Sequence, residues 1–148
     1  MQAGVGICME PTGIIELLDL QRHPEGGWYR ETWRSPAAPG ERSAMTAIHF
    51  LLEAGQRSHW HKVDADELWA WHAGSALQLL RAAPDGRRNA CLLGGDVLAG
   101  QQSHLVIPAG HWQAAQASFG WALVSCVVAP GFEFSGFELA PPGWEPGG

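Results

Sequence analysis

Two histidines and a carboxylate form the most reactive grouping in this sequence. His59 and His61 lie two positions apart in a segment with strand-like alternation, and Glu67 opens the next such segment. Alternate residues of a strand share a face, so we expect both imidazoles to point the same way. The carboxylate of Glu67 can then fold back to meet them. Such a set could ligate iron, manganese, nickel or zinc, or it could move protons, because a histidine titrates near neutral pH.

Aromatic side chains follow Glu67 at the same spacing. Trp69 and Trp71 share its face of the strand, so we expect them to line a cavity, where flat rings can stack on a planar ligand. A simple core role is the alternative interpretation. Trp60 and Trp112 should face the opposite way, toward a second sheet or a second subunit.

An earlier segment, 25–31, combines two glycines with polar and aromatic side chains. Tyr29 and Glu31 share one face of the strand expected there, and Trp28 and Arg30 share the other. If the first face borders the cavity, Tyr29 could act as an acid or hydrogen-bond donor and Glu31 as a carboxylate partner. The alternative is an edge strand in which Arg30 pairs with an acid.

Ten short strands are expected to position these groups. They are predicted at 28–33, 43–52, 58–63, 67–73, 77–82, 89–93, 103–107, 111–117, 121–128 and 133–139. A short helix should precede them, capped by Thr12 with Ile14 and Leu17 on its apolar face. Strands at this spacing, separated by glycine and proline turns, predict an all-β sandwich or barrel. The length of 148 residues fits one domain, with a core at about 14–139 and a Pro/Gly-rich tail at 140–148.

Composition excludes several classes of partner. The net charge is -6 and the nine Lys and Arg residues form no basic stripe, so nucleic acid is not an expected partner. No stretch approaches the roughly 20 apolar residues that span a bilayer, and no signal sequence is visible. Three cysteines without a paired spacing suggest neither a disulfide framework nor a zinc ribbon, which favours the cytoplasm. Eight tryptophans hint at an aromatic interface in a homodimer.

Two segments carry a family resemblance. Residues 55–74 resemble the first cupin motif, and residues 108–113 resemble the second. The wider pattern is similar to a cupin subfamily of mostly uncharacterised proteins, a domain of unknown function (DUF985). Its marks here are residues 23–31, 58–61, 66–69, 108–115 and 128–132. The resemblance implies a cupin-type jelly-roll β-barrel with a short N-terminal helix, and a homodimer.

Only some of the cupin metal positions carry a metal-ligating residue type in this sequence. The resemblance places His61 at the first histidine position and Glu67 at the carboxylate position, but Val63 at the second histidine position and Gln113 at the third. A metal would have to recruit His59, Gln113 or His111, which shares the side of Gln113. No particular cofactor is therefore favoured. A divalent transition metal held by His59, His61 and Glu67 is the alternative.

Three functional hypotheses follow. The first is a cupin that binds a small polar or planar molecule through Trp69, Trp71, Gln113, His59, His111 and Glu31. In this hypothesis it transforms the molecule without a metal, with His61 as base and Glu67 or Tyr29 as acid or orienting group. Metal-free sugar epimerases of the superfamily are a precedent by analogy. The second is a metal-dependent dioxygenase or isomerase. The third is a non-catalytic sensor or storage module.

Overall fold

The computed structural model of the chain describes residues 10–147. The elements run in the order α1 (Pro11–Leu17), β1 (Gln21–Arg22), β2 (Trp28–Arg34), β3 (Thr46–Leu52), β4 (Arg57–Val63), β5 (Asp66–Gly74), β6 (Leu77–Ala82), β7 (Arg88–Leu93), η1 (Val97–Ala99), β8 (His104–Ile107), β9 (Trp112–Gln116), β10 (Ala122–Ala129), η2 (Phe134–Gly136) and β11 (Phe137–Leu139). The predicted all-β class is confirmed.

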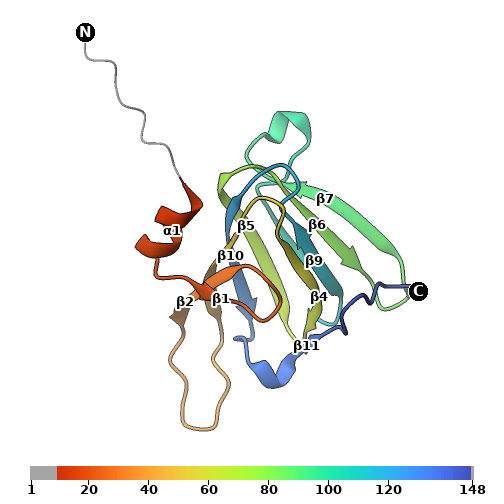
Figure 1. Cartoon of the computed structure of the whole chain (residues 1–148). Coiled ribbons are helices and arrows are strands. Elements are labelled where there is room, and N and C mark those ends of the chain that lie inside the picture. The colour runs from red at the N-terminus through yellow and green to blue at the C-terminus, as the bar shows by residue number, and fades with distance from the viewer. Residues whose placement is uncertain (1–9, 148) are drawn as a thin grey trace.

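Two antiparallel sheets face each other as a jelly roll (Figure 1). The first has the order β1-β2-β3-β10-β5-β8 and the second the order β11-β4-β9-β6-β7. Alternate residues of each strand point inward and form one apolar core between the sheets. Its largest fully buried members include Trp69, Phe50, Leu77, Leu79 and Val124. The core occupies one end of the space between the sheets and leaves the other end to polar side chains.

The helix α1 covers part of the outer face of the first sheet. Ile14 packs with Leu20 and Leu51 in a cluster that also includes Leu123 of β10. The helix begins at Pro11 after Glu10 rather than at a cap by Thr12, and Leu17 is 84% exposed rather than part of the packed face. At seven residues the helix is too short to present a long apolar stripe, so one turn makes most of its contacts.

The C-terminal segment covers the outer face of the second sheet (Figure 1). The Ala140 N–H donates to the carbonyl of Trp60, and the rings of Trp112 and Trp144 lie 4.5 Å apart. Trp60 and Trp112 therefore face away from the interior, as predicted, but the chain's own tail packs against them. The last strand begins at Phe137 rather than at residue 133, because a 3-10 turn (η2) precedes it.

Two further observations concern the described residues 10–147. Cys91 and Cys126 are free thiols, whereas Cys8 lies outside the described part. None of the helices in this part is long and apolar enough to cross a membrane.

Candidate functional site

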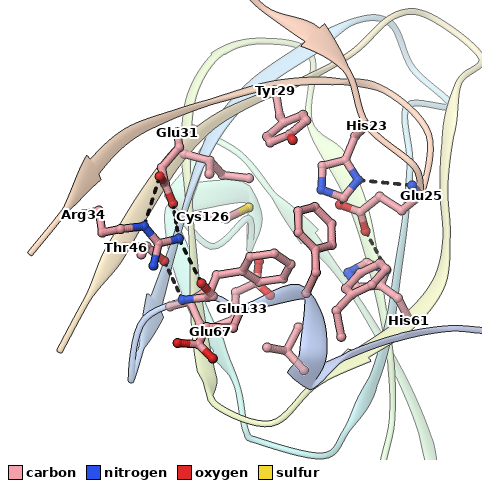
Figure 2. A pocket seen from close by; sticks show the side chains of 16 residues that line it. His23, Glu25, Tyr29, Glu31, Arg34, Thr46, His61, Glu67, Cys126 and Glu133 are labelled. Carbon is pink, nitrogen blue, oxygen red and sulfur yellow. Dashed lines mark hydrogen bonds and ion pairs between the residues drawn. The ribbon is translucent and has the colours of Figure 1, made fainter. Parts of the chain in front are cut away.

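A cavity of about 410 Å³ opens between the two sheets, at the end where β2, β3 and the segment before β11 meet (Figure 2). One wall is aromatic, with Phe132, Phe134 and Phe137 in mutual edge contacts. The other walls carry ionisable groups. The lining residues are His23, Glu25, Tyr29, Glu31, Arg34, Thr46, Ile48, His61, Val63, Glu67, Cys126, Val128, Phe132, Glu133, Phe134 and Phe137.

Glu25 is the centre of the polar cluster (Figure 2). Its Oε2 atom lies 2.6 Å from Nδ1 of His61 and accepts a 2.9 Å hydrogen bond from the Ser58 hydroxyl. Its Oε1 atom lies 3.4 Å from Nδ1 of His23. The side chains of Glu25 and His61 are only 6% and 3% exposed, so this is a buried ion pair. A buried carboxylate of this kind needs several partners to offset its loss of hydration.

Two glycines allow Glu25 to reach this position. Gly26 has φ +108°, and a Cβ atom there would lie 2.2 Å from the carbonyl oxygen of Arg57. Gly27 has φ +81°, and a Cβ there would meet the Leu52 side chain at 2.6 Å. The loop can therefore press against β3 and β4 only without side chains at these positions. In this close approach the His59 N–H donates to the Glu25 carbonyl at 2.7 Å.

A bulge in β4 decides which histidine enters the cavity. Ser58 pairs with Ala115 and His61 with Gln113, so three steps along β4 match two along β9. Ser58 and His61 therefore both point inward. His59 points away, and its Nε2 lies 2.9 Å from the carbonyl of Pro141. The expectation that His59 and His61 share a face was wrong, because the extra residue reverses the alternation.

The pair of His61 and Glu25 favours the charged forms of both groups. Burial alone would lower the pKa of His61, but the charge and hydrogen bond of Glu25 outweigh it and raise this pKa to about 9. Burial alone would raise the pKa of Glu25, but His61 outweighs it and lowers this pKa below its ordinary value. His61 is therefore an imidazolium at neutral pH. Its Nδ1 atom is directed at Glu25 and at the carbonyl of His59, 2.7 Å away.

His23 differs from His61 in its charge state. Its Nδ1 accepts a 3.1 Å hydrogen bond from the Glu25 N–H, so that nitrogen carries no proton. Burial lowers the pKa of His23, and this effect exceeds the opposing charge of Glu25. The ring stands edge-on to Tyr29, with centroids 4.4 Å apart. His23 is therefore a neutral imidazole beside a charged one.

Glu67 faces the cluster from β5. It is 6% exposed and accepts a 2.9 Å hydrogen bond from Nε2 of Gln113. Burial raises the pKa of Glu67 to about 7, with His61 lowering it and Glu25 raising it by charge. Cys126 of β10 also hydrogen-bonds Glu67, and burial raises the pKa of this thiol well above its ordinary value. At neutral pH the carboxyl of Glu67 can therefore both take up and release a proton.

The mouth of the cavity is formed by β2. Tyr29 and Glu31 share a face, as the alternating pattern predicted, and both line the mouth. A bulge between Glu31 and Trp33 then turns Arg34 to the same side, where it forms a bidentate pair with Glu31 at 2.6 and 3.2 Å. The Arg34 guanidinium also donates to the Phe132 carbonyl at 3.0 Å. This links the mouth strand to the aromatic wall.

Four expected cavity residues lie elsewhere. Trp69 is buried in the core, where its Nε1 donates to Oε1 of Gln113 at 2.7 Å. Trp71 packs beside the core and donates to the carbonyl of Ser75. Gln113 lies behind Glu67 rather than on the cavity surface, and His111 is half-buried without lining the cavity. The cavity end of β5 is already filled by Glu67, so the next two indoles lie deeper between the sheets.

Comparison with known proteins decides the family. The sequence profile of the Cupin superfamily (DUF985) matches residues 12–140. The chain belongs to this cupin family. Protein SO0799 from Shewanella oneidensis is 37% identical, with a TM-score of 0.84 over 90% of this chain and 85% of that one. A hypothetical protein from Leishmania major is 33% identical, with a TM-score of 0.79 over 89% and 88%.

Two further similarities are more distant. The uncharacterized protein YML079W of Saccharomyces cerevisiae is 28% identical over 84% of this chain and 73% of its own length. Oxalate decarboxylase of Bacillus subtilis is 17% identical, with a TM-score of 0.64 over 83% of this chain and 31% of that one. The last similarity concerns the fold alone.

The side chains of this cupin do not fit the metal site that its fold family can carry. Val63 and Gln113 stand where the cupin motifs that this chain resembles have histidines, and Nδ1 of His61 is directed at Glu25. The described residues contain no group of three or more His, Cys, Asp or Glu side chains arranged to hold a metal ion. His59, which the metal hypothesis required, points to Pro141. The donor set thus lacks the converging ligands that a transition metal needs.

Sequence reasoning missed two central residues, His23 and Glu25. Both stand in the 23–31 segment that marks the family, but no strand or spacing rule connects that segment to His61. The available signal was a titratable pair followed by two consecutive glycines. Such glycines can indicate a close backbone approach, and a close approach brings the preceding side chains into contact with the neighbouring strand.

Proposed function

We propose that this cupin binds a small polar molecule in its cavity and catalyses proton transfer on it without a metal, in the manner of an isomerase or epimerase. The observation that carries the proposal is the presence of His61 and Glu67, two buried titratable groups in different charge states, in one cavity with an aromatic wall. Environments that set neighbouring groups apart in this way are typical of acid–base catalysis.

The geometry favours roles opposite to those expected from the sequence. Glu67, with a pKa of about 7, is suited to abstract a proton from a carbon next to a carbonyl group. His61, held as imidazolium by Glu25, is suited to donate to or stabilise the oxygen that becomes negative. Return of the proton to another carbon, or to the other face of the same carbon, completes the isomerisation without net gain or loss of atoms. Tyr29 faces the same space and can orient the substrate through its hydroxyl.

The test follows carbon-bound hydrogen in D₂O. A panel of small 2-oxo acids, ketoses, aldoses and sugar acids is screened for binding by saturation-transfer NMR. Each compound that binds is then incubated with the protein, and loss of its proton signal next to the carbonyl is recorded. We expect exchange with the wild-type protein and at least about a hundredfold slower exchange in Glu67→Gln and His61→Gln proteins.

A matched control is Glu138→Gln, because this carboxylate is exposed on β11 and pairs with Lys62 outside the cavity. It should leave the exchange rate unchanged. If the compounds that bind depend on His61 but keep all of their carbon-bound hydrogen, the catalytic proposal fails and the cavity belongs to a binding or sensor module.

A further inference from the structure

Glu67 stands at the end of a buried hydrogen-bond chain that starts in the core. The indole Nε1 of Trp69 donates to Oε1 of Gln113 at 2.7 Å, and Nε2 of Gln113 donates to Oε1 of Glu67 at 2.9 Å. Trp69 and Gln113 are each 1% exposed, and Glu67 is 6% exposed. The chain therefore lies away from water, which could otherwise replace either of its bonds.

The direction of this chain is fixed by its first member. An indole nitrogen can only donate, so the oxygen of the Gln113 amide must face Trp69 and its NH₂ group must face Glu67. Oε1 of Glu67 thus meets a donor in either protonation state of the carboxyl. A proton on Oε1 would occupy a lone pair of the oxygen that already accepts from the amide, whereas a proton on Oε2 leaves this hydrogen bond intact.

We infer that Trp69 and Gln113 are positioning residues that keep Oε1 of Glu67 as an acceptor and leave Oε2 as the atom that takes up and releases the proton. The catalytic use of Oε2 rests on the proposed function, but the placement of the proton does not. Gln113 also pairs with His61 across β9 and β4. Gln113 therefore connects Glu67 of the first sheet with β4, the strand of the second sheet that carries His61, the other proposed catalytic group.

The hydrogen-bond chain gives a physical reason for the glutamine that stands at a cupin metal-ligand position. Gln113 stands at a histidine position of the family's metal pattern. In this chain the side chain at that position accepts from an indole and donates to a carboxylate, which occupies both ends of the amide. The carboxyl of Glu67 is thereby free to titrate rather than to ligate.

Other groups that act on Glu67 come from three neighbouring elements. His61 of β4 and Glu25 of the loop before β2 act by charge, and Cys126 of β10 donates a hydrogen bond from its thiol. Cys126 is the cross-strand neighbour of Trp69, and Trp69→Phe keeps an aromatic ring beside this thiol while it removes the indole donor. A change in the titration of Glu67 after that replacement therefore reports on the chain through Gln113.

The experiment measures the pKa of Glu67 by ¹³C NMR of protein labelled at its glutamate carboxyl carbons, with the Glu67 signal assigned from Glu67→Gln. In Gln113→Met the donor to Oε1 is lost while shape and length are kept, so the pKa of Glu67 should rise by about one or more. In Trp69→Phe the amide is free to turn its oxygen toward Glu67, which favours the protonated carboxyl and should also raise this pKa.

Trp71→Phe is the matched control. Trp71 lies on the same strand and its indole also donates, but to the Ser75 carbonyl, so its loss should leave the pKa of Glu67 unchanged. An unchanged pKa in folded Trp69→Phe protein would overturn the inference, and this variant carries the test if Gln113→Met does not fold. If the pKa rises as expected and no compound exchanges hydrogen in D₂O, the positioning chain stands and the proposed catalysis is what fails.

Discussion

Glu25 controls the charge of His61. The carboxylate accepts from the Ser58 hydroxyl and pairs with His61, and its 2.6 Å contact to His61 is the shorter of the two. A single buried charge would be costly, and the pair is stable only because each member neutralises the other. The charge state of the cavity therefore depends on a residue that lies outside both cupin motifs.

Replacing this carboxylate should discharge the histidine. In the Glu25→Gln protein, burial is no longer opposed by the charge of Glu25, so we expect the pKa of His61 to fall from about 9 to its ordinary value or below. Titration of the imidazole ring by ¹H–¹⁵N NMR measures this change, and Glu138→Gln serves as the control for a distant carboxylate. A histidine that still titrates near pH 9 in the Glu25→Gln protein would refute the role given to Glu25.

At the scale of elements, the loop before β2 must pass close to β4 to deliver Glu25. We expect Gly26→Ala to lower the free energy of unfolding by more than about 2 kcal/mol, because the new Cβ adds a backbone clash to an unfavourable φ. Gly40→Ala isolates the effect of the unfavourable φ, since Gly40 has φ +79° and open space around its Cβ position. It should cost about 1 kcal/mol. Urea denaturation compares the two, and equal losses would show that the close approach is unimportant.

The elements were predicted more fully than the site, for a physical reason. Apolar runs and turn residues mark strands locally, and β6 was predicted with the bounds it has. The direction of a side chain depends on the register with a partner strand, which the sequence does not display. One extra residue in β4 turned His59 outward, and one in β2 turned Arg34 inward. His61 and Glu67 line the cavity as expected, and Tyr29 and Glu31 share a face that borders it because no bulge lies between these two residues.

At the scale of the whole molecule, the tryptophans are used mainly within the chain. Trp69 and Trp71 belong to the interior between the sheets, and Trp60, Trp112 and Trp144 form the contact between the second sheet and the tail. Trp33, at 52%, is the most exposed of the eight. Their number alone thus no longer points to an interface between barrels. The homodimer stays a prediction, and light scattering of the purified protein measures it directly.

The two raised pKa values should also make the stability of the whole molecule depend on pH. The folded state holds the Glu67 proton to about pH 7 and the His61 proton to about pH 9, above their ordinary values of 4.5 and 6.5. Because the folded state binds more protons at these two groups, their contribution to the free energy of unfolding must fall as pH rises through these two intervals, whereas the lowered pKa of His23 acts in the opposite direction as pH rises toward 6.5. Each contributes on the order of 3 kcal/mol, at about 1.4 kcal/mol for every unit of difference in pKa.

Urea denaturation of the wild-type and variant proteins at pH 5, 7 and 9 isolates the contribution of each group. Glu67→Gln should flatten the decrease between pH 5 and 7, and Glu25→Gln should flatten that between pH 7 and 9, since His61 then binds no extra proton. Glu138→Gln makes the same Glu-to-Gln change at an exposed position, so this control protein should retain both decreases. If the Glu67→Gln and Glu25→Gln proteins show the same pH dependence as the wild type, these two groups do not hold their protons in the folded cavity.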